Sequence, residues 1–466
     1  MKLLLKYKLL LISFLIISGC VSDKNLTDNT YFGGKIINPK STKVYFYDGS
    51  RLLDSAKLNE NNKFIFEFDS LKVGLYTFEH GREMQFVFLE PNDSLLLRLN
   101  TWDFDESLIF SGKGADKNNL LLNLFLENEK EDKLFFNYYK LNDSLFELKI
   151  DSLLQLKKLL HKHFKEDVAE STPLFDELIN SAIFLPLYKK KEAYPYYHKR
   201  ALKLDEYPKI NPSFYKFRKE INLNDENLQN FYAYNDYIKT YLFHLSNEKR
   251  LINKGSHFWT NFIEVTANYI NSDKLKNRFF NEAMWNVLLD ENISLSEKEK
   301  AQTLFFENCN DKELVENVKE LIRASESPKK GSLFPTIQVF NITGDKIKIT
   351  DITKDRNTVI YFWPKKLHQI ENLAKRVDYL QKMHPDVHFV GINSKNIDYN
   401  WKSYIKSNNF NANYQFSLDK NSIDNDWLLV DYSRTILVDK NGIIQNGFTD
   451  LSNSKFEKQL KKLKKN

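Results

Sequence analysis

The spacing of apolar residues changes twice along the chain and divides it into three regions. Between residues 31 and 111 apolar side chains recur at every second position, as in the run Phe64, Phe66 and Phe68. A period of two is typical of strands that bury one face. Clusters of Gly, Asn and Asp separate these runs. We therefore expect an N-terminal antiparallel β-sandwich of about seven or eight short strands.

The second region, from about residue 115 to residue 326, has the spacing of helices. Phe258, Phe262, Val265 and Tyr269 recur at intervals of three and four, which is the period of an amphipathic helix. No longer repeat period is present, so we expect a bundle or packed helical hairpins and not a solenoid. Five prolines in the middle of this region are predicted to mark helix ends: Pro173, Pro186, Pro195, Pro208 and Pro212.

The third region begins with a strand that turns directly into a helix. Thr358 to Trp363 is a β-branched and aromatic run, typical of a buried central strand, and Pro364 ends it. The apolar residues that follow have helical spacing: Leu367, Ile370, Leu373, Ala374 and Val377. Open α/β folds place their chemistry at the carboxyl end of such a strand.

The order of strand, Phe362-Trp363, short turn and helix resembles the thioredoxin-like fold, in particular the TlpA-like thiol-disulfide reductases of bacterial envelopes. The resemblance covers roughly the last third of the chain. It implies a hairpin at residues 339–351, a strand at 387–393 and a helix at 401–407. A strand with a hairpin turn at 435–442 and a closing helix at 456–463 follow. The β-region also resembles the small domain that precedes the thioredoxin-like domain in lipoproteins of this type, through Gly74-Leu75-Tyr76, Phe88 to Ser94 and Phe110-Ser111-Gly112.

We therefore expect a multidomain α+β protein. The predicted parts begin with a lipoprotein signal peptide at residues 1–19 and a tether at 20–30. They continue with a β-sandwich domain at 31–114, a helical domain at 115–326 and a thioredoxin-like α/β domain at 327–466. The segment Ser325 to Ser332 is the predicted linker before the last part.

The redox residues that the resemblance implies are missing. Relatives carry Cys-x-x-Cys at a helix N-terminus, where the dipole stabilises a thiolate, but those positions fall on Leu367 and Ile370 here. The family's cis-proline position falls on Ser433. The resemblance then implies a vestigial active-site surface for binding an extended peptide. Its residues would be Trp363, Pro364, Leu367, His368, Ile370, Ser433 and Arg434. We expect no catalytic residue and no cofactor.

His368 would stand at the start of the active-site helix. An imidazole there could bind an anion or donate a hydrogen bond, although the helix dipole opposes its protonation. A surface residue without a role is the alternative. Lys365 and Lys366 beside it suggest a basic rim at the vestigial pocket.

The N-terminus has the pattern of a bacterial lipoprotein. Lys2, Lys6 and Lys8 precede a short apolar run from Leu9 to Ile17, and Ile17-Ser18-Gly19-Cys20 fits a lipoprotein cleavage box. Cys20 is thus the predicted lipidation site, and an uncleaved membrane anchor is the alternative. Either places the rest of the chain in the cell envelope. Lipid on Cys20 would anchor it to a bacterial membrane, with the outer membrane favoured on its periplasmic or surface face.

Charge and cysteine content narrow the function classes. Lys and Arg number 68 against 62 Asp and Glu, a formal net charge of +6. Removing Lys2, Lys6 and Lys8 with the signal peptide leaves +3, which gives no reason to expect nucleic-acid binding. If Cys20 carries lipid, Cys309 is left alone, so no internal disulfide can form. A buried, inert thiol is the expected state of Cys309.

Three other groups of residues were weighed for chemistry. His161-Lys162-His163 has metal-binding residue types, but positions two apart face different sides of a helix, so a solvated face is favoured. The basic and aromatic run Lys189 to Arg200 could bind a glycan or an acidic partner, or its tyrosines could pack between helices. The lysines between Lys455 and Lys465 suggest a solubilising surface, with contact to anionic headgroups as the alternative.

Three hypotheses follow. The leading one is a membrane-anchored envelope lipoprotein whose thioredoxin-like domain is a non-redox binding or scaffold module for an envelope protein or peptide. The second is a thiol-disulfide oxidoreductase of the TlpA-like family, acting through Cys309 or through a partner's cysteines. The third is a glycan or cell-wall binding protein.

Overall fold

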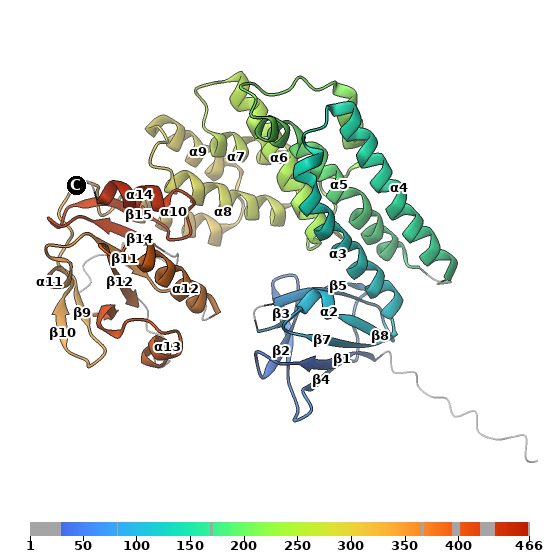
Figure 1. Cartoon of the computed structure of the whole chain (residues 1–466), viewed down its shortest axis with the longest axis horizontal. Coiled ribbons are helices and arrows are strands. Elements are labelled where there is room, and N and C mark those ends of the chain that lie inside the picture. The colour runs from blue at the N-terminus through green and yellow to red at the C-terminus, as the bar shows by residue number, and fades with distance from the viewer. Residues whose placement is uncertain are drawn as a thin grey trace, which may run out of the picture. The chain divides into compact units, whose positions relative to one another are not determined.

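A computed structural model describes residues 29–81, 83–167, 171–364, 368–393, 401–419 and 434–464. The chain forms two compact units, each described below by itself (Figure 1). Unit 1 comprises Met1–Lys216 and Asn230–Asp236, and unit 2 comprises Phe217–Gln229 and Tyr237–Asn466. Both units contain helices and sheets, which confirms the prediction of a mixed α+β protein.

The first eight strands of unit 1 form two four-stranded sheets, with the orders β4-β1-β7-β8 and β3-β2-β5-β6. These strands are β1 (Thr30–Ile37), β2 (Lys43–Asp48), β3 (Arg51–Lys57), β4 (Lys63–Phe68), β5 (Gly74–His80), β6 (Glu83–Leu89), β7 (Ser94–Asn100) and β8 (Ile109–Lys113). Neighbours are antiparallel except β1 and β7, which are parallel. The expected antiparallel pattern fails there because the chain passes through the other sheet before β7 is added.

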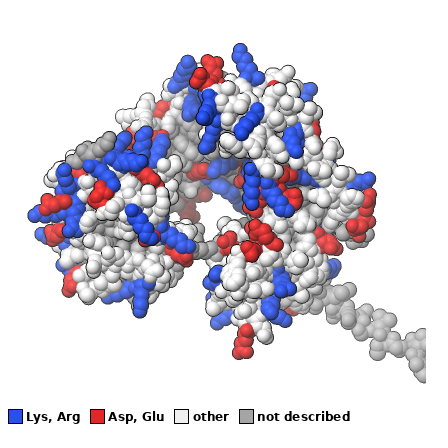
Figure 2. Space-filling view, viewed as in Figure 1, with Lys and Arg blue, Asp and Glu red and all other residues white. Residues whose placement is uncertain are grey.

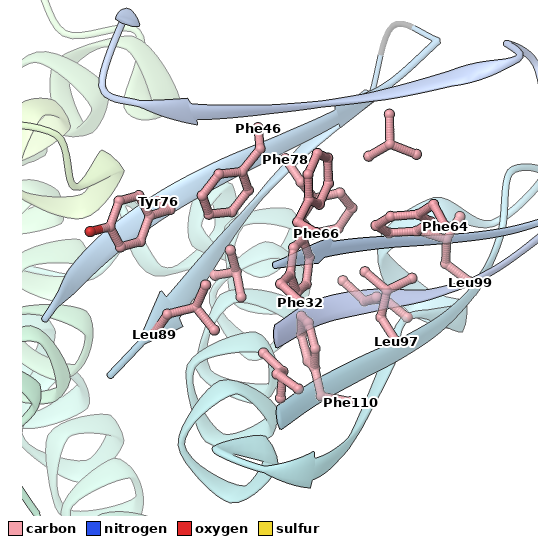
Figure 3. Packing of buried hydrophobic residues seen from close by; sticks show 14 of the residues in the cluster. Phe32, Phe46, Phe64, Phe66, Tyr76, Phe78, Leu89, Leu97, Leu99 and Phe110 are labelled. Atoms are coloured by element: carbon pink, nitrogen blue, oxygen red, sulfur yellow. The ribbon is translucent and has the colours of Figure 1, made fainter. Parts of the chain in front are cut away.

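Aromatic side chains from both sheets form one core (Figure 3). Phe32 of β1 contacts Phe46 of β2 with ring centroids 5.6 Å apart, and Phe78 of β5 at 5.5 Å. All three side chains are fully buried. Burying a side chain of this size contributes about 2–3 kcal/mol to stability. The aromatic residues at alternate positions therefore hold the two sheets face to face.

Helix α3 (Ala115–Tyr138) contacts an edge strand of each sheet, β6 and β8. Asn118 bonds the backbone of Phe88 on edge strand β6, accepting from its N–H and donating to its carbonyl, both at 2.8 Å. Asn119 does the same to Phe110 on edge strand β8, at 3.0 Å. This Asn118–Asn119 pair supplies partners to backbone groups that a sheet edge otherwise leaves unpaired.

The remaining helical elements of unit 1 lie beyond the sandwich, and the last two extend into unit 2. They are α4 (Asp143–Asp167), α5 (Pro173–Leu202), η1 (Pro212–Glu220) and α6 (Tyr232–Ile252), and a short α2 (Phe104–Ser107) precedes β8. The expectation that prolines end helices is wrong for Pro186 and Pro195, which both lie inside α5. Helix α5 buries a dozen side chains, and this packing outweighs the backbone hydrogen bonds that the prolines remove.

Unit 2 contains four further helices that follow α6 in the chain: α7 (Phe258–Tyr269), α8 (Asp273–Leu289), α9 (Leu295–Asn308) and α10 (Lys312–Glu326). Side-chain oxygens of Ser272, Ser294 and Asp311 accept from backbone N–H groups at the starts of α8, α9 and α10. Such caps satisfy N–H groups that have no partner within the helix.

The C-terminal part of unit 2 is a seven-stranded mixed sheet in the order β10-β9-β13-β12-β11-β14-β15. Its elements are β9 (Gln338–Phe340), β10 (Lys346–Lys348), α11 (Ile349–Thr353), β11 (Thr358–Phe362), α12 (His368–Met383), β12 (His388–Asn393), α13 (Trp401–Ser407), η2 (Ala412–Tyr414), β13 (Gln415–Leu418), β14 (Thr435–Val438), β15 (Ile444–Thr449) and α14 (Phe456–Leu463). Strands β11, β12 and β13 are parallel, and β14 and β15 follow antiparallel. Strands β13 and β15 lie outside the ranges that the sequence pattern gave, although the expected hairpin turn at residues 440–442 does lead into β15.

The outer edge of β15 is covered by the segment that follows α10. Gly331 N–H donates to the Ile444 carbonyl at 2.7 Å, and Phe334 N–H donates to Gly442 at 2.8 Å. Helices α8 and α10 pack on β15, where the Trp285 and Phe448 rings lie 5.5 Å apart. The predicted linker is thus a packed part of unit 2 and not a free connection.

We predict that Asn118→Ala lowers the free energy of unfolding of unit 1 by about 3 kcal/mol, because it leaves the buried N–H and carbonyl of Phe88 without partners. Asn119→Ala should cost less, about 1–2 kcal/mol, since that side chain is only half-buried. Hydrogen exchange of peptides covering β6 and β8 measures the effect on each strand. The matched control is Asn123→Ala, an exposed position on the same helix, and an equal effect there would contradict the assignment.

A second prediction concerns His80, the buried last residue of β5. Its Nε2 accepts from the Lys40 N–H at 3.0 Å, and Nδ1 lies 3.0 Å from the Lys43 carbonyl. Burial lowers the pKa of His80 below its usual 6.5, so the unfolded chain binds the proton more readily than the folded one. The free energy of unfolding should therefore fall as the pH drops below about 6.5, until the folded pKa is passed.

Urea unfolding of the wild type and His80→Gln between pH 5 and pH 8 checks this expectation. The variant should lose stability less steeply than the wild type on the acid side. His163→Gln removes a histidine whose side chain is 71% exposed and should leave the wild-type slope unchanged. Parallel curves for wild type and His80→Gln would refute the role of His80.

Candidate functional site

The candidate site lies at the carboxyl end of β11, the strand between β12 and β14. All five residues of β11 are buried, which confirms the predicted buried central strand. Ile360 and Phe362 face one core, and Val359 and Tyr361 face the other. The strand is therefore held on both faces, and the residues that follow it start from a fixed position.

Trp363 and Pro364, the first residues after β11, are both buried. The backbone N–H of Trp363 donates to the Ile392 carbonyl at 2.9 Å, which extends the pairing with β12. Its ring stacks on Phe410 at 5.4 Å and meets the Trp401 ring edge-on at 6.2 Å. These contacts make Trp363 part of the core beneath the site and leave its ring almost no exposed area.

A buried polar network joins Trp363 to the neighbouring strands. The indole N–H of Trp363 donates to Gln415 Oε1 at 3.1 Å, and Gln415 Nε2 lies 2.9 Å from the Tyr361 hydroxyl. Burial raises the pKa of Tyr361 far above 10, so the phenol stays protonated and serves as a hydrogen-bonding group. The network is one of neutral groups and contains no nucleophile.

Gly391 on β12 makes room for this network. A Cβ atom there would lie 2.1 Å from Gln415 Oε1 and 2.8 Å from the Tyr361 ring. No real Cβ has such contacts, so a side chain at this position would displace both partners. Sequence reasoning missed Gly391 and Gln415, although a glycine inside a strand is a signal for close approach by another group.

Helix α12 begins at His368, whose backbone alone is described. Two residues later Ile370 is 1% exposed and packs in the core shared with Val377 and Phe456. The position that the resemblance equates with a redox cysteine is thus filled by a core side chain. Leu367 and Ser433, the two other positions of the expected redox site, lie outside the described residues.

Arg434 directs its side chain toward β15. The guanidinium donates to the Gly447 carbonyl, from Nε at 3.0 Å, and to the Ser327 carbonyl, and it lies 5.4 Å from the Phe448 ring. Burial lowers the pKa of Arg434 to about 9, which still leaves it charged at neutral pH. The structure therefore brings Trp363, Pro364 and Ile370 together, whereas the Arg434 side chain joins the sheet to the end of α10.

Cys309 follows α9 and is 8% exposed. Its sulfur lies 3.6 Å from Asn277 Oδ1, and burial raises the pKa of the thiol. A raised pKa reduces the thiolate fraction and with it the reactivity. The expectation of a buried free thiol is confirmed.

The other groups weighed from the sequence are held by structural contacts. In the run Lys189 to Arg200, Tyr194 and His198 are buried and bond backbone carbonyls of Leu141 and Tyr139 at 2.8 Å. Tyr196 and Tyr197 remain partly exposed. Lys455 of the C-terminal lysines pairs with Asp290 at 3.1 Å.

Searches of the described residues for two further kinds of feature gave negative results. They contain no group of three or more His, Cys, Asp and Glu side chains placed to hold a metal ion. Their helices include none that is both long and apolar enough to cross a membrane. On the face seen in Figure 2, basic and acidic side chains are interspersed.

Comparison with known proteins gives structural neighbours for part of the chain. No family model and no curated protein sequence matches it. A thiol:disulfide interchange protein from Bacteroides sp. matches with 20% identity and a TM-score of 0.23, over 25% of this chain and 80% of that one. The thioredoxin domain of a thiol-disulfide oxidoreductase from Bacteroides vulgatus matches with 23% identity and a TM-score of 0.22, over 26% and 88% of the two chains. The neighbours are thioredoxin-like thiol-disulfide proteins.

We predict that Gln415→Leu destabilises unit 2 by about 3 kcal/mol, because it leaves the Tyr361 hydroxyl and the Trp363 N–H buried without this partner. Adding Tyr361→Phe should restore about 1 kcal/mol, since it removes one of the two stranded groups. Urea unfolding of the single and double variants measures both effects. Gln369→Leu on the exposed face of α12 is the control, and a loss as large there would contradict the network's role.

Proposed function

We propose that this chain is a membrane-anchored lipoprotein of the cell envelope, whose C-terminal thioredoxin-like region binds an envelope protein or peptide without redox chemistry. Its parts in this proposal are the β-sandwich, the helical region and the thioredoxin-like region, with the boundaries expected from the sequence. Nucleic acid, metal and organic cofactors have no part in it.

The observation that carries the proposal is the state of the residues at the start of α12. Ile370 is a core side chain there, and the sequence holds just two cysteines, Cys20 and Cys309. A dithiol mechanism needs two cysteines within disulfide distance. Cys20 is the predicted lipidation site, and Cys309 is a buried thiol beside Asn277 and Asp311.

Burial limits which side chains can contact a partner. Trp363, Pro364 and Arg434 are buried, so they support a binding surface from beneath and do not line it. The proposal therefore assigns contact to the basic rim expected from the sequence, with Lys365, Lys366 and His368 as the candidate polar groups. Peptide backbone pairing beside the position of Ser433 is the expected binding mode by resemblance.

The proposed anchor lies close to the β-sandwich in the sequence. Thr30, the first residue of β1, comes ten positions after Cys20. A fully extended stretch of that length reaches at most about 35 Å. A lipid on Cys20 would therefore keep the β-sandwich near the membrane surface.

The oxidoreductase alternative would have to use Cys309 or the cysteines of another protein. Burial and the raised pKa of Cys309 argue against the first form. For the glycan alternative, Tyr196 and Tyr197 are the exposed aromatic residues of the Lys189 to Arg200 run. Their ring planes stand 83° apart, so they do not form the flat platform on which a sugar ring stacks.

A pair of cysteine variants tests the proposal, each serving as the control for the other. Cys20→Ser should release the protein from the membrane fraction and abolish incorporation of labelled fatty acid, while Cys309→Ser changes neither. Reduction of a disulfide substrate such as insulin should stay at the background rate for the wild type and both variants. Dithiol turnover by the wild type that Cys309→Ser abolishes would establish the oxidoreductase instead.

A further inference from the structure

Helix α4 of unit 1 carries two sets of apolar side chains, one buried and one exposed to solvent. Its inner face buries Phe146, Ile150, Leu153 and Leu154 in the helical part of unit 1. On its outer face five leucines are between 44% and 64% exposed: Leu145, Leu148, Leu156, Leu159 and Leu160. A helix that is packed on one side needs no second apolar stripe for its own fold, and so many leucines exposed on one helix indicate an interaction surface.

Four of the five exposed leucines, all except Leu160, are arranged symmetrically about Ser152. Leu148 and Leu156 lie four positions before and after it, and Leu145 and Leu159 lie seven positions away. Intervals of three and four keep these residues on one face of the helix. When two such helices pack antiparallel about Ser152, each leucine of this set meets a leucine, and the small serines allow close approach at the crossing.

Charge along α4 fixes the direction of such a pairing. Its first ten residues, 143–152, carry three carboxylates and one lysine, a net charge of −2. Residues 153–167, the rest of the helix, carry four lysines and two carboxylates, a net charge of +2 with neutral histidines. An antiparallel pair places each acidic half beside the basic half of the other helix, and it also opposes the two helix dipoles, whereas a parallel pair would align like charges.

Charges at the borders of α4 are already held within unit 1, which leaves the centre of the outer face apolar. Glu147 pairs with Lys191 at 2.7 Å, and Lys165 pairs with Asp176 at 3.1 Å. The positions Leu145, Leu148, Ser152, Leu156 and Leu159 themselves include no charged residue. Lys149, which the same spacing places on this face, holds its ammonium 4.9 Å from the Tyr138 ring centroid, so this cation already has an aromatic partner within unit 1 when a second copy covers the leucines.

From this arrangement we infer that the chain forms a two-fold symmetric homodimer through α4, packed antiparallel against α4 of a second copy. Ser152 lies at the two-fold axis and faces Ser152 of the partner subunit. Leu145 packs on Leu159 of the partner subunit, and Leu148 packs on Leu156 of the partner subunit. A self-complementary patch of this kind is what a closed dimer requires.

Disulfide trapping of the full chain tests the register. In a Cys309→Ser background, mild oxidation of Ser152→Cys should give a covalent dimer, because the two sulfurs meet at the axis. Lys162→Cys is the matched control on the same helix, since ten residues from the axis the two copies are about 30 Å apart. Leu145→Cys should crosslink to Leu159→Cys when the two variants are mixed, and not to itself.

Sedimentation of the purified protein tests the surface. A single helix pair of about 37 Å predicts a Kd in the micromolar range, and Leu148→Glu with Leu156→Glu should raise it by at least about 100-fold. Leu134→Glu on α3 alters a leucine of similar exposure, 51%, outside the stripe, and should leave the Kd unchanged. Equal disulfide trapping at positions 152 and 162 would overturn the inference. A wild-type protein that stays monomeric at concentrations 100-fold above the micromolar range would overturn it too.

Discussion

A strand at the edge of a sheet carries backbone N–H and carbonyl groups that need partners, and covering such edges organises both units of this chain. In unit 1 the Asn118–Asn119 pair bonds the backbones of Phe88 and Phe110 on two different sheets. In unit 2 the segment from Gly331 to Phe334 pairs with β15. The opposite edge, β10, is three residues long and bears Lys346 and Lys348, which discourages pairing with another chain by charge and shortness. These edges are thus capped by side chains of a helix, paired with a segment of chain, or kept short and charged.

The same demand for hydrogen-bond partners shapes the carboxyl end of β11. In a redox protein a pair of reactive sulfurs would occupy the start of the following helix. Here Ile370 packs into the core, and beneath it Trp363, Gln415 and Tyr361 satisfy one another. Such a network favours a single rigid arrangement, because each group is costly to separate from its partner in a low-dielectric interior. Such a rigid support is what the binding role proposed above requires.

Strands and helices could be predicted from the sequence, whereas the pairing of strands and the burial of single side chains could not. Alternating phenylalanines indicated the sandwich, and the run from Thr358 to Trp363 indicated the central strand, because period and residue type act locally. The parallel pairing of β1 with β7 depends on strands of another sheet, which periodicity cannot reveal. Helix α5 continues through Pro186 and Pro195 because its tertiary packing outweighs the local cost. At the site, Trp363 and Ile370 were identified as positions, but their burial, and the side-chain direction of Arg434, depend on Gln415, Gly447 and Ser327, which lie far away in sequence.

The packing of α8 and α10 on β15 has a consequence for how this protein can be divided. Phe448 lies against Trp285, and Arg434 is buried between β15 and the end of α10. A fragment that begins after α10 would turn an apolar ring and a desolvated cation into surface groups at the same strand. The C-terminal sheet is therefore not an independent domain. Recombination, natural or engineered, that moves it without α8 and α10 would leave the surface that these helices cover exposed to solvent.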